Sequence, residues 1–345
     1  MPFEKKKRML ILTDGNIDNA SARIRAILYI RFFESRGYKV KHISRIPQRA
    51  SDLVSKYSVF PILKRWYYLK MVFAFLLGKW DLVFIQRIFI GKNLLTLFRP
   101  RSIPFIYDFD DAIYLNSNRP SNRERTANMI RFASEVIVST GYLQEFCALN
   151  GKKAEIIPSP VETDRIRQSV KLGENIVTIG WIGSPWTTVF LELIETPLKK
   201  LAEKYSFIFL TVGARPDYKI AGINHIAKRW VFVNENEEIG KMDIGIMPLP
   251  DTEFARMKGG YKLLQYMSAG IPCVASPVGI NQSIVKPGEN GFLASTDEEW
   301  IIALENLIND PGLRLELGSN GRKDAVELFS REVCFDKLFR IIQKL

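Results

Sequence analysis

The chain has 345 residues, 47% of them apolar, so it is too long for one typical domain and is not expected to be globally disordered. Three widely spaced cysteines exclude a disulfide framework and favour a reducing compartment, and the presence of only two histidines excludes a multi-histidine metal centre. The net charge of +12 arises in the first half, since residues 1–165 carry 28 Lys and Arg against 15 Asp and Glu, which suggests a phosphate-bearing acceptor, an anionic membrane surface or nucleic acid as a partner.

The first half alternates apolar, strand-like runs with helical patterns. Strands are predicted at 9–13, 39–43, 82–86, 105–108, 136–139 and 156–158. Helices are predicted at 20–35, 61–77, 124–133 and 141–149. Continuous apolar strands that alternate with helices are typical of parallel sheets covered on both faces. This half is therefore expected to be an α/β domain.

The second half repeats that alternation. Strands are predicted at 177–182, 207–212, 231–232, 244–247, 272–275 and 292–293, and helices at 188–204, 261–269, 297–309 and 313–328. The predicted fold is thus α/β, with two doubly wound Rossmann-type domains that face each other across a ligand-binding cleft. A basic N-terminal domain is expected over 1–168, a C-terminal domain over 169–329, and a last helix over 330–345 that packs back on the N-terminal domain.

No leader or membrane-spanning segment is expected, because the apolar run at 9–12 is too short for a signal peptide and the run at 71–77 is too short to span a bilayer. The basic, aromatic segment 64–77 is compatible with two arrangements: lying in a membrane interface, or packing on the core with its basic ends at the surface. Neither the P-loop nor the G-x-G-x-x-G fingerprint is present, which disfavours a P-loop kinase and a nicotinamide dehydrogenase.

The most informative stretch begins at Lys258 and combines a glycine turn with a short helix. Gly259 and Gly260 allow a ligand to approach the backbone closely, and a helix that starts at Tyr261 presents its first N–H groups to an anion. Lys258 and Lys262 are expected one helical turn apart on the same face. This pattern predicts a phosphate-binding turn, with a solvated helix face as the alternative.

The block 243–291 resembles the donor-binding half of the retaining glycosyltransferases of family 4, which have the GT-B fold. It contains Ile-Gly-Ile-Met-Pro from residue 244, Lys-Gly-Gly-Tyr-Lys from 258, Ser-Ala-Gly-Ile-Pro-Cys-Val-Ala-Ser from 268 and Gly-Glu-Asn-Gly from 288. Other segments resemble further motifs of the family or of a subset of it: 21–25, 107–112, 156–160 and 179–187. The resemblance implies a GT-B fold and transfer of a sugar with retention.

Two positions depart from the family pattern. Many members carry two glutamates eight positions apart, where this chain has Met257 and Gln265. The resemblance places Gln265 at the nucleotide ribose, where its amide can still form hydrogen bonds. Met257 cannot replace a glutamate near the donor sugar, so Lys258 and Lys262 are expected to carry more of the contact with the donor phosphates.

The resemblance also implies roles at the donor. Gly183 and Thr187 are expected to bind it together with Gly259, Gly260 and Tyr261, although a plain strand-to-helix turn capped by Thr187 explains the same residues. Negative charge builds on the leaving diphosphate during sugar transfer. We therefore predict that Lys262 and Lys258 are catalytic, because their positive charges would stabilise the leaving diphosphate.

Three carboxylates end a strand of the first domain. Asp110 is predicted to orient or deprotonate the acceptor hydroxyl, with Asp111 on the acceptor side beside it. An Asp-x-Asp metal site that includes Asp108, or carboxylates paired with arginines at a helix start, are the alternatives. No metal is expected, because GT-B enzymes usually work without one.

Three arginines are also candidates for the acceptor side, where they would contact an anionic acceptor or the donor diphosphate: Arg23, Arg25 and Arg87. Simple surface solvation is the alternative for each of them.

These features together predict a cytoplasmic, peripheral membrane glycosyltransferase. It would move a hexose-type sugar from a nucleotide-diphosphate sugar to a glycan or lipid-linked acceptor, as in cell-envelope polysaccharide synthesis, with no cofactor. A nucleotide-sugar epimerase and a non-enzymatic anion- or nucleic-acid-binding protein are the alternatives. No specific nucleic-acid partner is expected, since neither a nucleic-acid motif nor a repeated base-stacking pattern is present.

Overall fold

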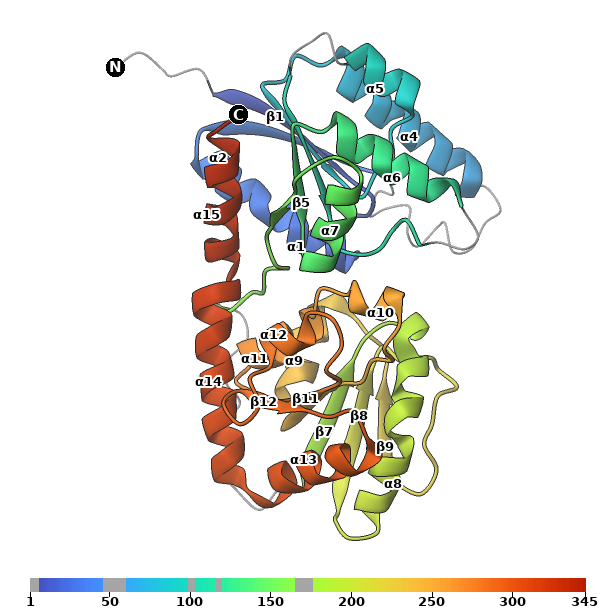
Figure 1. Ribbon diagram of the computed structural model, residues 1–345, viewed down its shortest axis with the longest axis vertical. Helices are drawn as coiled ribbons and strands as arrows, with labels where there is room; N and C mark the ends of the chain where they lie inside the picture. The colour runs from blue at the N-terminus through green and yellow to red at the C-terminus, as the bar shows by residue number, and fades with distance from the viewer. Residues whose placement is uncertain (1–5, 46–59, 99–102, 116–119, 165–175) are drawn as a thin grey trace. The chain divides into compact units, whose positions relative to one another are not determined.

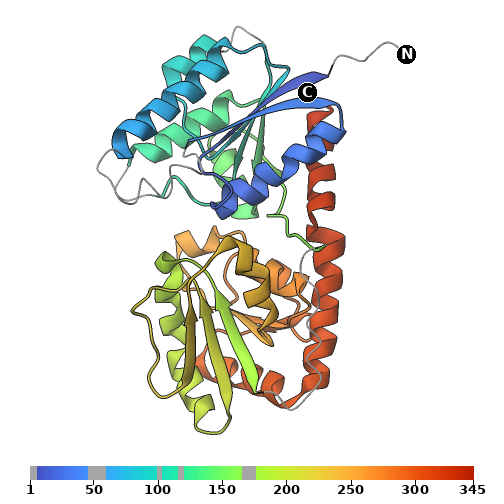
Figure 2. The ribbon, with the colours of Figure 1, turned by 180° about the vertical axis from the view of Figure 1, so that it is seen from behind.

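The computed structural model describes residues 6–45, 60–98, 103–115, 120–164 and 176–345. The chain divides into two compact units (Figures 1 and 2). Unit 1 comprises Met1–Ser159 and Phe335–Leu345, and unit 2 comprises Pro160–Cys334. Most of the polar stretch around 162–175, where a domain boundary is expected, lies outside the described residues.

Unit 1 is built on a sheet of six parallel strands in the order β2-β1-β3-β4-β5-β6. The strands are β1 (Lys7–Thr13), β2 (Tyr38–Ser44), β3 (Leu82–Gln86), β4 (Phe105–Phe109), β5 (Glu135–Val138) and β6 (Glu155–Ile156). Strands β3 and β4 are buried along their whole length, which explains why their sequences are apolar apart from Gln86 and Asp108.

The helices of unit 1 connect these strands. They are α1 (Ala20–Arg25), the 3-10 turn η1 (Ile27–Tyr29), α2 (Ile30–Ser35), α4 (Phe60–Leu77), α5 (Lys92–Phe98), α6 (Ser121–Phe132) and α7 (Gly141–Leu149). The single helix predicted over 20–35 is broken into three pieces. At the break, Ala26 has φ −139° and ψ −54°, which do not continue an α-helix. Sequence patterns missed α5.

The last helix, α15 (Arg331–Ile342), contributes its second half to unit 1. Phe335 packs against Tyr29 and Phe33, with ring centroids 5.4 and 5.0 Å away. Arg36, just after α2, lies 4.8 Å from the ring of Phe339 and forms an ion pair with Asp336. An aromatic cluster therefore holds this helix to the start of the chain.

Unit 2 repeats the architecture with six parallel strands in the order β12-β11-β10-β7-β8-β9. They are β7 (Val177–Ile182), β8 (Phe207–Val212), β9 (Asn224–Lys228), β10 (Ile244–Met247), β11 (Cys273–Ala275) and β12 (Gly291–Leu293). The predicted fold class, two doubly wound α/β domains, is confirmed. The predicted strand at 231–232 is wrong, because β9 forms the edge of the sheet at Asn224–Lys228 and is mostly exposed, so it has no apolar run.

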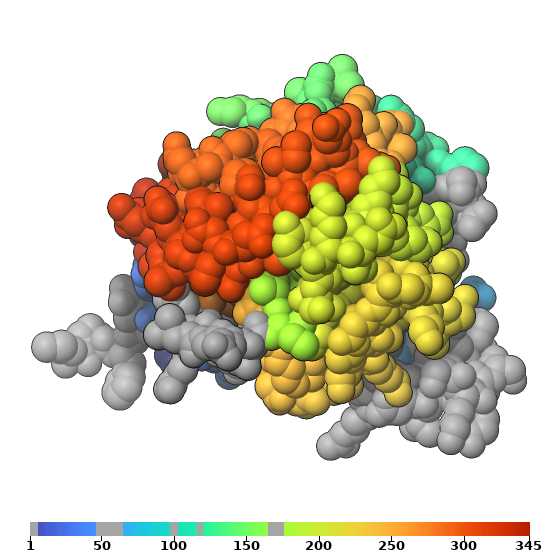
Figure 3. All heavy atoms as spheres, turned by 90° about the horizontal axis from the view of Figure 1, so that it is seen from below, coloured from blue at the N-terminus to red at the C-terminus, as the bar shows by residue number. Residues whose placement is uncertain are grey.

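The helical elements of unit 2 cover the two faces of its sheet. They are η3 (Pro185–Ile194), α8 (Glu195–Ala202), η4 (Phe232–Asn234), α9 (Glu235–Gly240), α10 (Glu253–Arg256), α11 (Tyr261–Ser268), α12 (Asn281–Ile284), α13 (Asp297–Asn309) and α14 (Pro311–Phe329). Figure 3 shows α13 in orange-red beside α8 in yellow-green, and the two helices share one core cluster through Leu198 and Leu304. Among the described residues, no helix is both long and apolar enough to cross a membrane.

Candidate functional site

The sheet of unit 2 reverses its strand order beside its first strand. The chain runs from β7 outward through β8 and β9, and then returns to the other side of β7 with β10, β11 and β12. Ligands of doubly wound sheets bind outside the carboxyl ends of the strands at such a switch point. The ends of β7 and β10 therefore define the first candidate site.

Tyr266 of α11 fixes both strands at this point. Its side chain is fully buried; its hydroxyl accepts a hydrogen bond from the amide of Ile182 at 3.1 Å and donates one to the carbonyl of Ile246 at 3.2 Å. Burial raises the pKa of Tyr266 well above its ordinary value, so the hydroxyl stays protonated and can donate. Sequence patterns gave no signal for this residue beyond its place in a buried helix.

Lys262, in the first turn of α11, lies beside the turn after β7. Its ammonium is 4.6 Å from the ring centroid of Trp181, which is fully buried. A Cβ atom at Gly183 would lie 3.0 Å from Cε of Lys262 and would clash with the Trp181 ring. A side chain at position 183 would therefore displace the lysine, and the structure brings the predicted residues Gly183 and Lys262 together.

Thr187 belongs to a capping turn at the start of η3. Its hydroxyl accepts from the amide of Ser184 at 3.3 Å and donates to the carbonyl of Ser184 at 3.0 Å. The structure therefore has a capped strand-to-helix turn here, but its N-cap residue is Ser184, and Thr187 is the partner three positions later rather than the cap that was predicted as the alternative. A capped turn beside Gly183 can also bind phosphate through its backbone N–H groups.

The glycine turn before α11 has the backbone that its sequence suggests. Gly260 has a φ of 67° and caps the helix, which starts at Tyr261 as predicted. The first N–H groups of any α-helix point out along its axis, and here they lie at the switch point beside Lys262. Gly259 precedes this cap and is partly buried, and Tyr261 packs against the core beneath it.

Lys258 is not placed as predicted. It precedes the helix, so it does not share a helical face with Lys262, and its ammonium lies 4.4 Å from the ring centroid of Phe254 on α10. Met257 and Gln265, which stand where many family members carry glutamates, differ in their burial. Gln265 on α11 is 4% exposed, whereas Met257, just after α10, is partly buried.

The sheet of unit 1 has its own switch point, between β1 and β3. Asp110, just beyond β4 and 8% exposed, lies in a hydrogen-bonded network there. Ser21 donates to its Oδ1 at 2.5 Å, and Gln86 donates to Ser21 at 2.7 Å. Ser139 donates to the Asp110 backbone carbonyl at 2.9 Å. Ser21 and Gln86 were missed as site residues, although Ser21 opens the Ser-Ala-Arg-Ile-Arg motif.

Arg87 directly follows β3 and has a strained backbone conformation. Its φ of 56° is the only positive value among the described non-glycine residues. Its Nη1 lies 3.4 Å from Asp110 and 3.6 Å from Asp111, and its side chain is 23% exposed. Such strain is typical of functional sites. The structure therefore brings three predicted residues together: Asp110, Asp111 and Arg87.

Arg23 and Arg25 were predicted to lie on an accessible acceptor surface, and this prediction is wrong. Arg25 is 2% exposed and forms an ion pair with Asp108, while Arg23 is 1% exposed and donates to the carbonyl of Ile17 at 3.0 Å. Both side chains point into unit 1, because α1 packs this face inward. Asp108, one of the carboxylates in the alternative metal site, is likewise engaged by Arg25. The described residues contain no group of three or more potential metal ligands.

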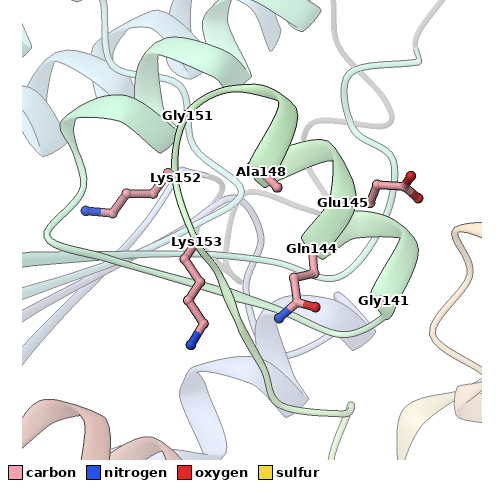
Figure 4. Close-up of a pocket in the computed structure, with 7 residues that line it drawn as sticks. All are labelled: Gly141, Gln144, Glu145, Ala148, Gly151, Lys152 and Lys153. Carbon is pink, nitrogen blue, oxygen red and sulfur yellow. The ribbon is translucent and has the colours of Figure 1, made fainter.

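A separate open hollow of about 470 Å³ lies on unit 1 beside α7 (Figure 4). It is lined by Gly141, Gln144, Glu145, Ala148, Gly151, Lys152 and Lys153. The Lys152 and Glu145 side chains extend to opposite sides of the view, so the charged groups do not converge on one point. None of the predicted site residues lines it.

The fold and the switch-point sites define the class of protein as one with the GT-B fold. The chain is similar to the sucrose-phosphate synthase of Thermosynechococcus elongatus, with a TM-score of 0.71 at 14% identity over 98% of this chain and 99% of that one. It is also similar to Anabaena Alr3699/HepE solved in complex with UDP, with a TM-score of 0.65 at 16% identity over 98% and 100% of the two chains.

The family match is narrower. Residues 173–310 match the family model "Glycosyl transferases group 1", and this range contains Gly183, Thr187 and the whole of α11. A curated relative, the N-acetyl-alpha-D-glucosaminyl L-malate synthase of Bacillus anthracis, is 22% identical over 139 residues, which cover 39% of this chain and 36% of the relative. At the level of this domain, the predicted enzyme class is confirmed: the chain carries a glycosyltransferase group 1 domain in a GT-B fold.

Proposed function

We propose that the protein is a retaining glycosyltransferase of the family 4 type that transfers a hexose from a nucleotide-diphosphate sugar to a glycan or lipid-linked acceptor. The observation that carries the proposal is the meeting of Lys262, Gly183 and the N-terminus of α11 at the switch point of the glycosyltransferase domain. A cation, a side-chain-free turn and a helix start are together suited to a diphosphate. The UDP complex of the similar HepE protein supports a nucleotide ligand for this fold.

Lys262 and Lys258 would stabilise the negative charge that develops on the leaving diphosphate. Preorganised donors of this kind contribute about 3–4 kcal/mol each to transition-state stabilisation in analogous sites. Gly183, Thr187, Gly259, Gly260 and Tyr261 would bind the donor through backbone and cap groups, and Gln265 the ribose. We propose that these cations make a metal unnecessary, so that activity persists in the presence of a chelator.

Asp110 would act on the acceptor hydroxyl, with Arg87 and Asp111 beside it. The short hydrogen bond from Ser21 and the contact with Arg87 hold the carboxylate in one orientation, which general base catalysis requires. We propose further that the reaction takes place in the cytoplasm, at the membrane surface, in the synthesis of a cell-envelope polysaccharide.

The test is a thermal-shift screen of nucleoside diphosphates and nucleotide sugars, followed by transfer assays with the stabilising donor. We expect one base to raise the midpoint of unfolding, since a ligand that binds only the folded state stabilises it. We also expect nucleoside diphosphate to be released only when an acceptor is present. Conversion of the donor to an epimer without release would contradict transfer, and stabilisation by no nucleotide would contradict the donor site.

A further inference from the structure

One helix of unit 1 exposes a continuous apolar stripe. On α4, four large side chains are 45–72% exposed: Trp66, Leu69, Phe73 and Leu77. Their spacing of three, four and four residues places them on one face of the helix. This set is called the α4 stripe below.

The core does not need this face, because the opposite face of α4 is already packed. Met71 is 1% exposed and Phe75 is fully buried, with its ring 6.2 Å from that of Phe105 on β4. Tyr68 also anchors the helix by donating its hydroxyl to the carbonyl of Phe89 at 3.1 Å. The helix thus has one apolar face in the core and a second one at the surface.

Positive charge surrounds the α4 stripe. Lys70 is exposed, and its ammonium lies 5.6 Å from the ring centroid of Trp66 and 5.9 Å from that of Tyr67. Arg65, before the α4 stripe in sequence, and Lys79, after it, are also exposed. The sequence contains no Asp or Glu between residues 53 and 80. A partner for this surface must therefore offer both an apolar layer and negative charge.

We propose that the α4 stripe docks on an anionic lipid bilayer, with α4 lying in the plane of the interface. Trp66 and Phe73 enter the boundary between headgroups and acyl chains, and Arg65, Lys70 and Lys79 contact lipid phosphates. An anionic bilayer provides both properties that the surface requires. The inference rests on the proposed function in one respect only, because it names the surface at which a lipid-linked acceptor is met.

The test is sedimentation of the full chain with vesicles of phosphatidylcholine alone or of an equal mixture with phosphatidylglycerol. We expect binding to the anionic vesicles to be about tenfold stronger or more. The double variant Phe73→Ser/Leu77→Ser should lose binding about tenfold or more, because two exposed apolar side chains are removed. Leu149→Ser, at an equally exposed leucine on α7, should bind as the wild type does.

Charge is tested separately by Lys70→Glu, which should weaken binding to anionic vesicles about tenfold. Its control is Lys153→Glu, which changes the net charge equally at an exposed site of unit 1 and should change binding less than about twofold. Equal binding to both vesicle types, or wild-type binding by both α4 variants, would overturn the proposal. So would a concentration-dependent dimer that the serine variant abolishes, since a second copy would then cover the stripe.

The vesicle result is independent of the donor site. In the thermal-shift screen, every α4 variant should respond to nucleotides as the wild type does, because the α4 stripe lies outside unit 2. If no nucleotide shifted the unfolding midpoint of the wild type, that result would count against the proposed function but would not affect the vesicle-binding result.

Discussion

Arg25 and Asp108 form a buried ion pair, with Nη2 of the arginine 2.5 Å from Oδ2 of the carboxylate and each side chain 2% exposed. Arg25 also donates through Nη1 to the carbonyl of Ile157 at 2.6 Å. One guanidinium therefore joins α1 to the end of β4 and to the segment after β6. Burial raises the pKa of Asp108 above its ordinary value, and the adjacent Arg25 guanidinium opposes that shift by favouring the ionised carboxylate.

Removing only the arginine should destabilise unit 1 strongly. Arg25→Met leaves the Asp108 charge buried without its partner, and we expect the free energy of unfolding to fall by about 3–5 kcal/mol. The double variant Arg25→Met/Asp108→Leu removes both charges and should recover most of that loss. Urea unfolding of both variants measures the difference, and a single variant as stable as the double one would show that the pair is not coupled.

The same pair shows why sequence patterns predicted the elements better than the site. The strand Val177–Ile182 has the predicted bounds, because all of its residues are buried and most of them are large and apolar. The partners Arg25 and Asp108, in contrast, are 83 residues apart. The inward direction of Arg25 depends on how α1 packs against β4, and no local pattern carries that information.

The glycine turn was predicted more completely. Gly260 and the start of α11 are local features, since a left-handed backbone and a helix start both leave sequence signals. The prediction that Lys258 shares a helical face with Lys262 was wrong, because Lys258 lies before the left-handed cap at Gly260 and the helix begins only at Tyr261. The contact between Lys262 and Trp181 joins α11 to β7, which are far apart in the sequence and meet only in the folded domain. The Gly-Trp-Ile-Gly motif indicated β7 as part of the site, but it did not indicate this contact.

His42 should make stability depend on pH. Burial lowers the pKa of His42 from its ordinary value to about 4, and its Nε2 is 2.8 Å from the hydroxyl of Thr13. The unfolded chain then binds a proton more readily than the folded one, so the stabilisation present above about pH 6.5 is lost as the pH falls toward 4.

We expect His42→Asn to lose less stability than the wild type between pH 7 and pH 5, by at most about 2 kcal/mol. Urea unfolding at the two pH values measures this difference. Asp108 acts in the opposite direction in this range, because its pKa is raised, and both proteins share that contribution. His225, whose pKa burial also lowers, provides a second test through His225→Asn. Equal pH dependence in the wild type and His42→Asn would contradict the assignment.

Gly260→Ala should weaken both the fold and donor binding. The φ of 67° disfavours any side chain, and an added Cβ would lie 2.5 Å from Cδ1 of Ile284. We expect a loss of about 2 kcal/mol or more in the free energy of unfolding. Gly222→Ala is the matched control, because Gly222 has a φ of 84° with no atom within 4 Å of the added Cβ, and it should lose only about 1 kcal/mol. Equal losses would show that Ile284 moves aside freely.

Asp110→Asn should reduce kcat about 10²–10⁴-fold without changing nucleotide affinity, if the carboxylate handles the acceptor proton. Ser21→Ala should have a smaller effect, about tenfold, because it removes only the hydrogen bond that orients Asp110. Steady-state kinetics with saturating donor measures both. A nucleotide affinity that falls in parallel with kcat in Asp110→Asn would assign Asp110 a structural role in its place.

Lys262→Met should separate catalysis from folding. The methionine side chain can still cover the ring of Trp181, so we expect the free energy of unfolding to change by less than about 0.5 kcal/mol. The ammonium is lost where charge would build on the leaving diphosphate, and kcat should fall about 10²–10³-fold. Lys199→Met, at a half-exposed lysine on α8 paired with Glu195, is the control and should keep wild-type turnover.

Because the charge of Lys262 is needed most in the transition state, kcat of Lys262→Met should fall more than its affinity for the donor. Unchanged turnover at saturating donor would remove Lys262 from the mechanism, and a fall in donor affinity alone would restrict it to ground-state binding of the phosphates.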